Sequence, residues 1–278
     1  MLMPIHSTLR GWTRALPLAA LLGLAGCDLI EFSPNDHRVP EEFTNLTAKN
    51  LAKLQARPLA DGDTLRFVFT GDSQNFYGEA EDLVASVNQQ PGIAFLLVAG
   101  DISDYGLARE MRWVDERLRR LKVPYLTVVG NHDLVGNGRE TYRHIYGPLN
   151  YSFVYGDTKF VLVDTNGREY NFNGQIPDLS WLQPQLANLE GARRQVVISH
   201  VPPTSNDFDP AVRMPYVRAL REASGLVFEM NGHNHQSSIG QPYNDGVTYV
   251  NSDAFSEHRY FVVTVWGDRQ FRIKQITF

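Results

Sequence analysis

Five apolar segments of this chain each end on polar side chains that can bind a metal ion. One run, PYLTVVG, leads into Asn131, His132 and Asp133, and the other four end on Asp72, on Asp101, on His200, and on His233 with His235. Each run is typical of a buried strand, and in open α/β sheets ligands bind beside the carboxyl ends of the strands. Packing alone does not explain five such endings. The pattern therefore predicts a convergent metal site at the strand tips.

Strand-like and helix-like segments alternate through most of the chain. We expect strands at 65–71, 93–99, 124–129 and 195–199, and helices near 78–90, 105–122, 138–146, 178–190 and 210–223. Hairpins are expected at Gly156-Asp157 and Gly267-Asp268, and the C-terminal part is rich in strands. This order predicts an α/β fold, a four-layer α/β/β/α sandwich of two mixed sheets with outer helices.

The sequence also predicts two details of the helices. The charged residues of helix 105–122, including Glu110 and Asp115, are assigned to a solvated face. Pro184 is expected in the first turn of its helix, or at a kink.

Composition and charge narrow the class of partner. Of the 278 residues, 43% are hydrophobic and 21% charged, which is enough apolar material for one large core. The formal net charge is -5 with no long basic run, so a surface that wraps nucleic acid is not expected. A small phosphorylated substrate is still compatible, because bound cations would dominate the local field.

The N-terminus has the features of a secretion signal. Arg10 and Arg14 precede a short apolar segment that ends in Leu-Ala-Gly before Cys27, the only cysteine. This resembles a bacterial lipobox, which implies acylation of Cys27, attachment to a membrane, and a lipid-anchored, extracytoplasmic place in the bacterial cell envelope. Asp28 resembles an inner-membrane retention signal. A plain signal peptide, or a short anchor with an incidental cysteine, is the alternative.

These features divide the chain into three expected parts. Residues 1–26 are expected to be the signal peptide, 27–60 a tether with a short helix, and 61–278 the domain that carries the motifs at the strand tips. Within the tether, EEFTNLTAKNLAKLQA carries apolar residues at helical spacing, so we expect an amphipathic helix that packs on the domain. A fully disordered stalk is the alternative.

Together, the motifs at the strand tips identify a family. Alone, a Gly-Asp pair is usually a turn, and a single His200 is more often a hydrogen-bonded core residue. In order, from about residue 64 to about 254, the motifs resemble those of the calcineurin-like metallophosphoesterases. They are Asp72-Ser73-Gln74, Gly100-Asp101, Gly130-Asn131-His132-Asp133, His200 and Gly232-His233-Asn234-His235.

The resemblance implies two metal ions, divalent or trivalent and drawn from Mn, Fe and Zn. Asp101 would bridge them. Asp72, Gln74 and His235 would hold one ion, and Asn131, His200 and His233 the other. His132 would act as the general acid, or help to bind phosphate, and would be oriented by Asp104 in preference to Asp133.

Two positions depart from the family pattern. Gln74 stands where the family usually has histidine, and a carboxamide binds metal more weakly than imidazole. Tyr105 replaces an arginine typical of the protein serine/threonine phosphatase branch, which argues against that branch.

The resemblance implies a hydrolase of phosphate mono- or diesters, with a phosphorylated small molecule or lipid as substrate. The loops 166–178 and 202–215 are expected to set specificity. Arg168, Tyr170, Phe172 and Arg213 are candidate contacts there, with ordinary exposed loop residues as the alternative. A non-catalytic metal- or ligand-binding lipoprotein on the same fold is the competing function, and Gln74 is its support. Nothing in the sequence fixes the oligomeric state.

Overall fold

The computed structural model describes residues 38–59 and 64–278. The expected signal peptide, Cys27 and Asp28 lie outside these residues. Among the helices of the described part, none is both long and apolar enough to cross a membrane.

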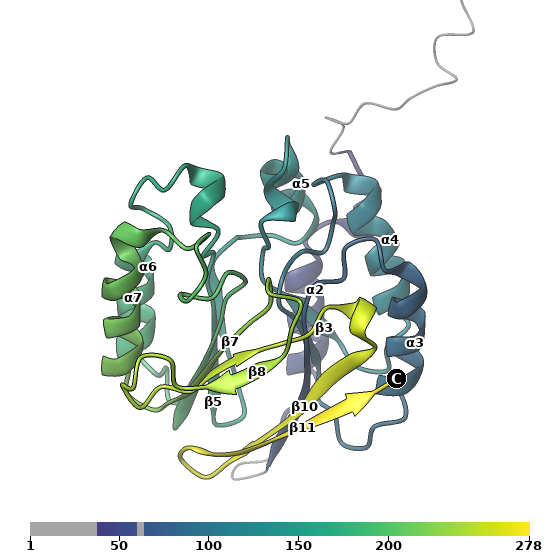
Figure 1. Cartoon of the computed structure of the whole chain (residues 1–278). Helices are drawn as coiled ribbons and strands as arrows, with labels where there is room; N and C mark the ends of the chain where they lie inside the picture. Colours follow the sequence, from purple (N-terminus) through teal and green to yellow (C-terminus); the bar gives the residue numbers. More distant parts are fainter. Residues whose placement is uncertain (1–37, 60–63) are drawn as a thin grey trace, which may run out of the picture. The chain divides into compact units, whose positions relative to one another are not determined.

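Eleven strands of the described chain form two mixed sheets (Figure 1). The first has the order β11-β10-β1-β2-β3, with β1, β2 and β3 parallel and β10 antiparallel to β1. Its strands are β1 (Leu65–Thr70), β2 (Leu96–Val98), β3 (Tyr125–Thr127), β10 (Arg259–Trp266) and β11 (Gln270–Thr277). The second has the order β4-β5-β6-β7-β9-β8, parallel from β5 to β9 with antiparallel edges. Its strands are β4 (Tyr151–Tyr155), β5 (Thr158–Leu162), β6 (Arg194–Ile198), β7 (Leu226–Asn231), β8 (Ser238–Gly240) and β9 (Tyr249–Asn251).

The expected four layers are confirmed. Helices α3 (Tyr77–Val87), α4 (Ala108–Leu118) and α5 (Gly138–Ile145) cover the first sheet, and α6 (Leu179–Ala187) and α7 (Pro210–Glu222) the second (Figure 1). Alternation along the strands builds this order, because successive side chains point to opposite faces. In β1, Phe67 and Phe69 enter the core between the sheets and Val68 packs towards the helices. In β5, Phe160 faces the shared core and Val161 faces α6 and α7.

The segment before the first strand is packed against this sandwich. Helix α2 (Leu46–Gln55) follows a short 3-10 turn, η1 (Glu41–Phe43). It buries Leu54 in the core between the sheets and Leu46 in the core under the outer helices. Gln55 also donates a hydrogen bond from Nε2 to the Val154 carbonyl, at 2.9 Å. For these residues the amphipathic helix is confirmed and the disordered stalk is wrong.

Two local expectations need correction, and one strand was not foreseen. Glu110 and Asp115 on α4 are buried rather than solvated, because they accept hydrogen bonds from the loop before α4 and from the Tyr125 hydroxyl. Pro184 lies in the second turn of α6, whose N-cap is Asp178. Strand β8 was not expected, because its three residues are exposed and lack an alternating pattern.

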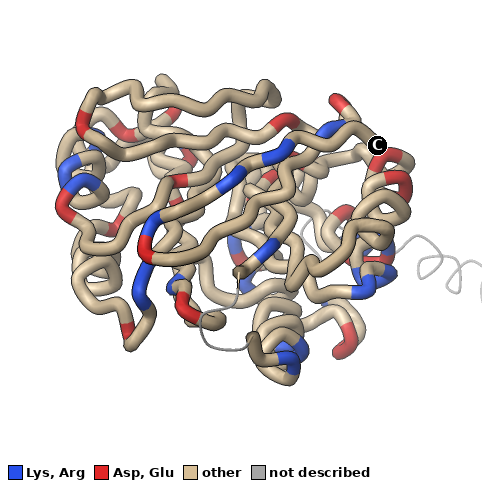
Figure 2. The backbone as a smooth tube through the Cα atoms, turned by 90° about the horizontal axis from the view of Figure 1, so that it is seen from below, with Lys and Arg blue, Asp and Glu red and all other residues tan. Residues whose placement is uncertain are grey.

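The edge of the first sheet is exposed and charged. Strand β11 leaves most of its side chains in solvent, and it carries Arg272 and Lys274. Figure 2 shows basic positions along this strand as it runs to the C-terminus. Charged side chains on an exposed edge strand hinder its pairing with a second chain.

Candidate metal centre

The strand tips of both sheets bring the expected site residues together. In the first sheet, the turns after β1, β2 and β3 carry Asp72, Asp101 and Asn131. In the second, His200 follows β6, and the pair His233 and His235 follows β7. Because these strands are parallel within each sheet, their carboxyl ends meet at the same edge. Nitrogen or oxygen atoms of Asp72, Asp101 and His200 all lie within 4.8 Å of one another, and all three residues are buried.

One group of donor atoms converges on Asn131. Its Oδ1 lies 2.9 Å from Nε2 of His200 and 3.0 Å from Nδ1 of His233. Nε2 of His200 is also 3.2 Å from Oδ2 of Asp101. Nδ1 of His200 lies 2.5 Å from the carbonyl oxygen of Ala99, so this nitrogen carries the hydrogen. In neutral His200 the Nε2 lone pair would then face two oxygen atoms, an arrangement that a cation between them stabilises.

A second group forms around Asp72. Its Oδ2 is buried and accepts no hydrogen bond from the described residues, and it lies 3.1 Å from Nε2 of His235. A buried carboxylate oxygen without a donor is costly unless a cation compensates it. Gln74 reaches the same place, since its Nε2 donates to Oδ2 of Asp101 at 3.4 Å. To bind a metal ion, this amide would have to turn its oxygen inward.

The buried carboxylates at the strand tips require a positive charge close to them. Burial raises the pKa of Asp72 to about 6, and the nearby charge of Asp101 adds to this effect. Burial opposes the charged form of His200, but the charge of Asp101 and the hydrogen bond to it raise the pKa of His200 to about 10. In the chain alone, a proton on His200 therefore neutralises part of the acidic cluster. The mixture of carboxylate, carboxamide and imidazole donors fits Mn, Fe or Zn in place of that proton.

The backbone at the site is held in unusual conformations. Gln74, Asp101, His233 and His235 have positive φ angles of 31°, 49°, 69° and 54°. Such angles are uncommon outside glycine and cluster at functional sites. The close approach of the turns also requires glycine at position 130, because a Cβ there would lie 2.0 Å from the backbone nitrogen of Asp101. The site is thus built into the main chain as well as the side chains.

Asp133 ties two of these turns together. Its carboxylate is fully buried and accepts hydrogen bonds from the backbone nitrogens of Ile102, Ser103 and Gly130, and from the Ser103 hydroxyl. Burial raises the pKa of Asp133 to about 6, while these donors act to lower it. All its hydrogen bonds go to the turns after β2 and β3, so Asp133 braces the turns.

His132 lies at the open side of the centre. Its backbone nitrogen donates to Oδ1 of Asp101 at 2.8 Å, while its side chain is 40% exposed. Nδ1 lies 2.9 Å from the carbonyl oxygen of Asp104 and 3.8 Å from that residue's carboxylate. Burial opposes protonation, but Asp101 and Asp104 outweigh it and raise the pKa of His132 above its usual value. The ring can therefore carry a proton where a substrate would enter.

The two long loops after β5 and β6 meet beside this centre. Arg168 donates from Nη1 to Oδ1 of Asp207 at 3.1 Å, and Oδ2 of Asp207 lies 3.2 Å from Nε2 of His233. Sequence reasoning missed Asp207, because a single acidic residue in a loop carries no motif. The only signal was its place in a loop already marked for specificity.

The other candidate contacts lie further from the chemistry. Tyr170 donates its hydroxyl to Oδ2 of Asp164 and packs under Arg139, whose guanidinium carbon is 5.2 Å from the ring centre. Arg213 donates from Nη2 to the carbonyl of Ser205, so it holds the loop after β6. Phe172 is 41% exposed at the loop surface.

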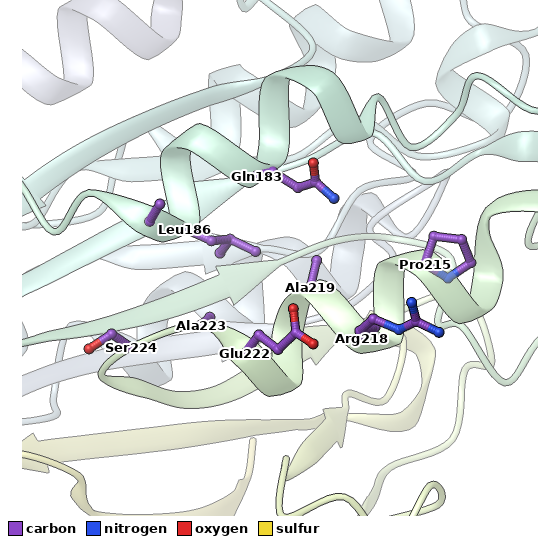
Figure 3. A pocket seen from close by; sticks show the side chains of 9 residues that line it. Gln183, Leu186, Pro215, Arg218, Ala219, Glu222, Ala223 and Ser224 are labelled. Carbon is purple, nitrogen blue, oxygen red and sulfur yellow. The ribbon is translucent and has the colours of Figure 1, made fainter.

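A groove on the outside of the second sheet does not mark the site. It runs between α6 and α7, has a volume of about 500 Å³, and is lined by Gln183, Leu186, Ala219 and Glu222 among others (Figure 3). Its lining mixes small apolar side chains with scattered charges. None of the metal-binding candidates contributes to it, so we locate the function at the strand tips.

The family model for calcineurin-like phosphoesterases matches residues 65–237. This chain belongs to that family, which supports metal-dependent hydrolysis of phosphoesters. A protein from Xenorhabdus bovienii, named a probable cyclic nucleotide phosphodiesterase, is 25% identical over 224 residues, covering 78% of this chain and 72% of its own length.

Solved structures share the fold at low sequence identity. A dimetal phosphatase from Danio rerio superposes with a TM-score of 0.59 at 15% identity, covering 77% of this chain and 98% of that one. The purple acid phosphatase PPD1 from yellow lupin (Lupinus luteus) gives 0.63 at 12% identity, covering 79% of this chain and 53% of that one. The four-layer arrangement is therefore the fold of known phosphatases.

Proposed function

We propose that this protein is a two-metal phosphodiesterase that uses His132 as its general acid. The observation that carries the proposal is the convergence of two donor groups on Asp101. One contains Asn131 and His200, and the other contains Asp72. Bound metal ions would supply a water of lowered pKa as the nucleophile and would neutralise charge on the phosphoryl oxygens.

The remaining catalytic roles are assigned to residues of the chain. Asp101 contacts His200 of the first group at 3.2 Å and Gln74 beside the second at 3.4 Å, so it would be the ligand that both ions share. His132 is held by its backbone to Asp101 and by its ring to the carbonyl of Asp104. This leaves Nε2 free to give a proton to the departing alkoxide, a contribution worth about 10²–10⁴-fold in rate. Asp104 orients that ring.

We favour a diester over a monoester substrate. The relative from Xenorhabdus bovienii is named a probable cyclic nucleotide phosphodiesterase, and two carboxylates outside the proposed ligand set, Glu169 and Asp207, lie beside the centre. Glu169, whose Oε2 is buried and has no hydrogen-bond donor among residues 38–59 and 64–278, has a pKa raised by burial and further by Asp207 and Asp101. A diester carries one negative charge where a monoester carries up to two, so it is repelled less by these carboxylates.

The test replaces His132 with asparagine and measures metal content and turnover together. Bis(p-nitrophenyl) phosphate and p-nitrophenyl phosphate serve as diester and monoester, with Mn, Zn and Fe added in turn. We expect His132→Asn to lower kcat by about 10²–10⁴-fold while metal content stays unchanged.

His258→Asn is the matched control. His258 packs against Phe278 outside the site and has a φ of 52°, which asparagine tolerates. Full activity in His132→Asn would show that the general-acid role is wrong. Two bound ions without turnover of either ester in the wild type would favour the non-catalytic lipoprotein instead.

For the N-terminus we propose a lipid anchor at Cys27 that holds residues 61–278 outside the cytoplasm. The support is the sequence alone, namely the apolar segment and the Leu-Ala-Gly-Cys ending. Cys27→Ser should prevent acylation and release the protein from the membrane fraction. Unchanged processing and membrane retention in this variant would exclude the anchor.

A further inference from the structure

A carboxylate outside the family pattern contacts one of the proposed metal ligands. Oδ2 of Asp207 lies 3.2 Å from Nε2 of His233, while Nδ1 of the same ring lies 3.0 Å from Oδ1 of Asn131. Asp207 comes from the loop between β6 and α7, and His233 follows β7. The two nitrogens of the ring therefore face different partners.

These contacts decide which nitrogen of His233 carries the hydrogen. An ionised carboxylate accepts hydrogen bonds and cannot donate them, so Nε2 must be the donor to Asp207. In the neutral ring this leaves the lone pair on Nδ1, which faces the donor group of Asn131 and His200. Metal-binding histidines usually donate their other ring N–H to a carboxylate or carbonyl, which fixes both the tautomer and the orientation of the ring.

We propose that Asp207 is a positioning residue that holds His233 ready to bind a metal ion through Nδ1. The inference rests on the proposed two-metal function and adds a residue to it. Asp207 acts only through His233, so its effect should fall on the ion held by Asn131, His200 and His233. The ion held by Asp72 and His235 should be unaffected.

Arg168 orients Asp207 in turn. Its Nη1 donates to Oδ1 of Asp207 at 3.1 Å, and its backbone nitrogen donates to the Asp207 carbonyl at 3.2 Å. Among the residues that the structure describes, one oxygen of the carboxylate contacts Arg168 and the other contacts His233. The Arg168 side chain is 64% exposed, so its own contribution is small.

The experiment titrates the metal-free full chain with Mn²⁺ and measures the affinity of each ion by calorimetry. The wild type should bind two ions. We expect Asp207→Ala to weaken one ion by about 10–100-fold and to leave the other unchanged. Asp207→Asn keeps a carbonyl oxygen that can accept from Nε2, so it should restore most of the lost affinity.

Two controls separate positioning from a general structural effect. Asp157→Ala removes a comparable loop ion pair, that of Asp157 with Arg193 at 3.4 Å, away from the strand tips, and should change neither affinity. In a His233→Ala background, Asp207→Ala should cause no further loss of Mn²⁺ affinity, because its only route to the metal has been removed.

The outcomes distinguish this inference from the proposed function. If the wild type binds two ions and Asp207→Ala binds both equally well, the positioning role is overturned and the metal centre stands. An equal further loss in the His233→Ala background would also overturn the positioning role. A wild type that binds no Mn²⁺ would overturn both proposals.

Discussion

The turns that follow the strands of the first sheet and the loops that follow the strands of the second sheet build the site in different ways. The turns after β1, β2 and β3 are short, and the carboxylate of Asp133 ties two of them together. The loops after β5 and β6, residues 163–178 and 199–209, are longer and are held mainly by contacts with each other, such as that of Arg168 with Asp207. We infer that the residues at the strand tips of both sheets, His200 included, fix the chemistry, and that the rest of the two loops adjusts metal binding and substrate choice.

Removing the Asp133 carboxylate, which ties the turns after β2 and β3 together, should have the largest effect on stability. In Asp133→Ala, the backbone nitrogens of Ile102, Ser103 and Gly130 would lose their acceptor in a buried place. Each unsatisfied buried donor costs about 1–3 kcal/mol, so we expect the free energy of unfolding to fall by about 4 kcal/mol. Urea denaturation measures this loss.

The neighbouring Asp104→Ala is the control for stability. Its carboxylate is partly exposed, and its nearest charged partner is Nδ1 of His132 at 3.8 Å. It should cost less than about 1 kcal/mol. Equal losses for Asp133 and Asp104 would contradict the bracing role.

A buried glutamate beneath the loop after β6 should make the stability of the fold depend on pH. Glu229 on β7 accepts hydrogen bonds from Ser199, Tyr216 and Asn231, and burial raises its pKa to about 7. The folded state binds this proton more tightly than the unfolded state does, so the contribution of the proton to the free energy of unfolding is complete below about pH 4.5. This contribution, about 3 kcal/mol, is lost as the pH rises through about 7.

The check compares denaturation of the wild type and Glu229→Gln from pH 4.5 to 8. Glutamine has the same shape and no charge, so the variant should lack this part of the pH dependence. Parallel curves for the two proteins would show that Glu229 is ionised in the folded state throughout the range.

The smallest effect is expected from Arg213, which lies on α7 and holds the loop after β6. Arg213→Ala removes hydrogen bonds to the carbonyls of Ser205 and Phe208, each worth about 1 kcal/mol. We expect the free energy of unfolding to fall by about 2 kcal/mol, and KM for the diester to rise a few-fold with kcat unchanged. A large fall in kcat would mean that the loop takes part in the chemistry and that the distinction between the strand tips and the rest of the loops is wrong.

The sequence predicted the strands and the polar residues at their ends in both regions, but not the contacts that the two long loops make with each other. The apolar residues of strand 65–70 supply the two cores on its faces, and its polar end follows at once, so fold and candidate ligands could both be inferred. Asp207 and strand β8 left no such pattern. Asp207 acts through contacts with residues distant in the sequence, and β8 is a short, exposed edge strand paired with β9. The buried roles of Glu110 and Asp133 were also hidden, because sequence does not show which carboxylates accept backbone hydrogen bonds.

The most direct test of the account is the metal content of the purified chain, measured by mass spectrometry together with diester turnover. We predict two ions per chain, loss of both turnover and metal on chelation, and recovery of both when Mn or Zn is returned. Asp101→Asn, which changes the residue shared by both donor groups, should bind less metal and lose turnover by at least about 10³-fold, equivalent to about 4 kcal/mol. Undiminished turnover in a chain that holds no metal would contradict the central claim.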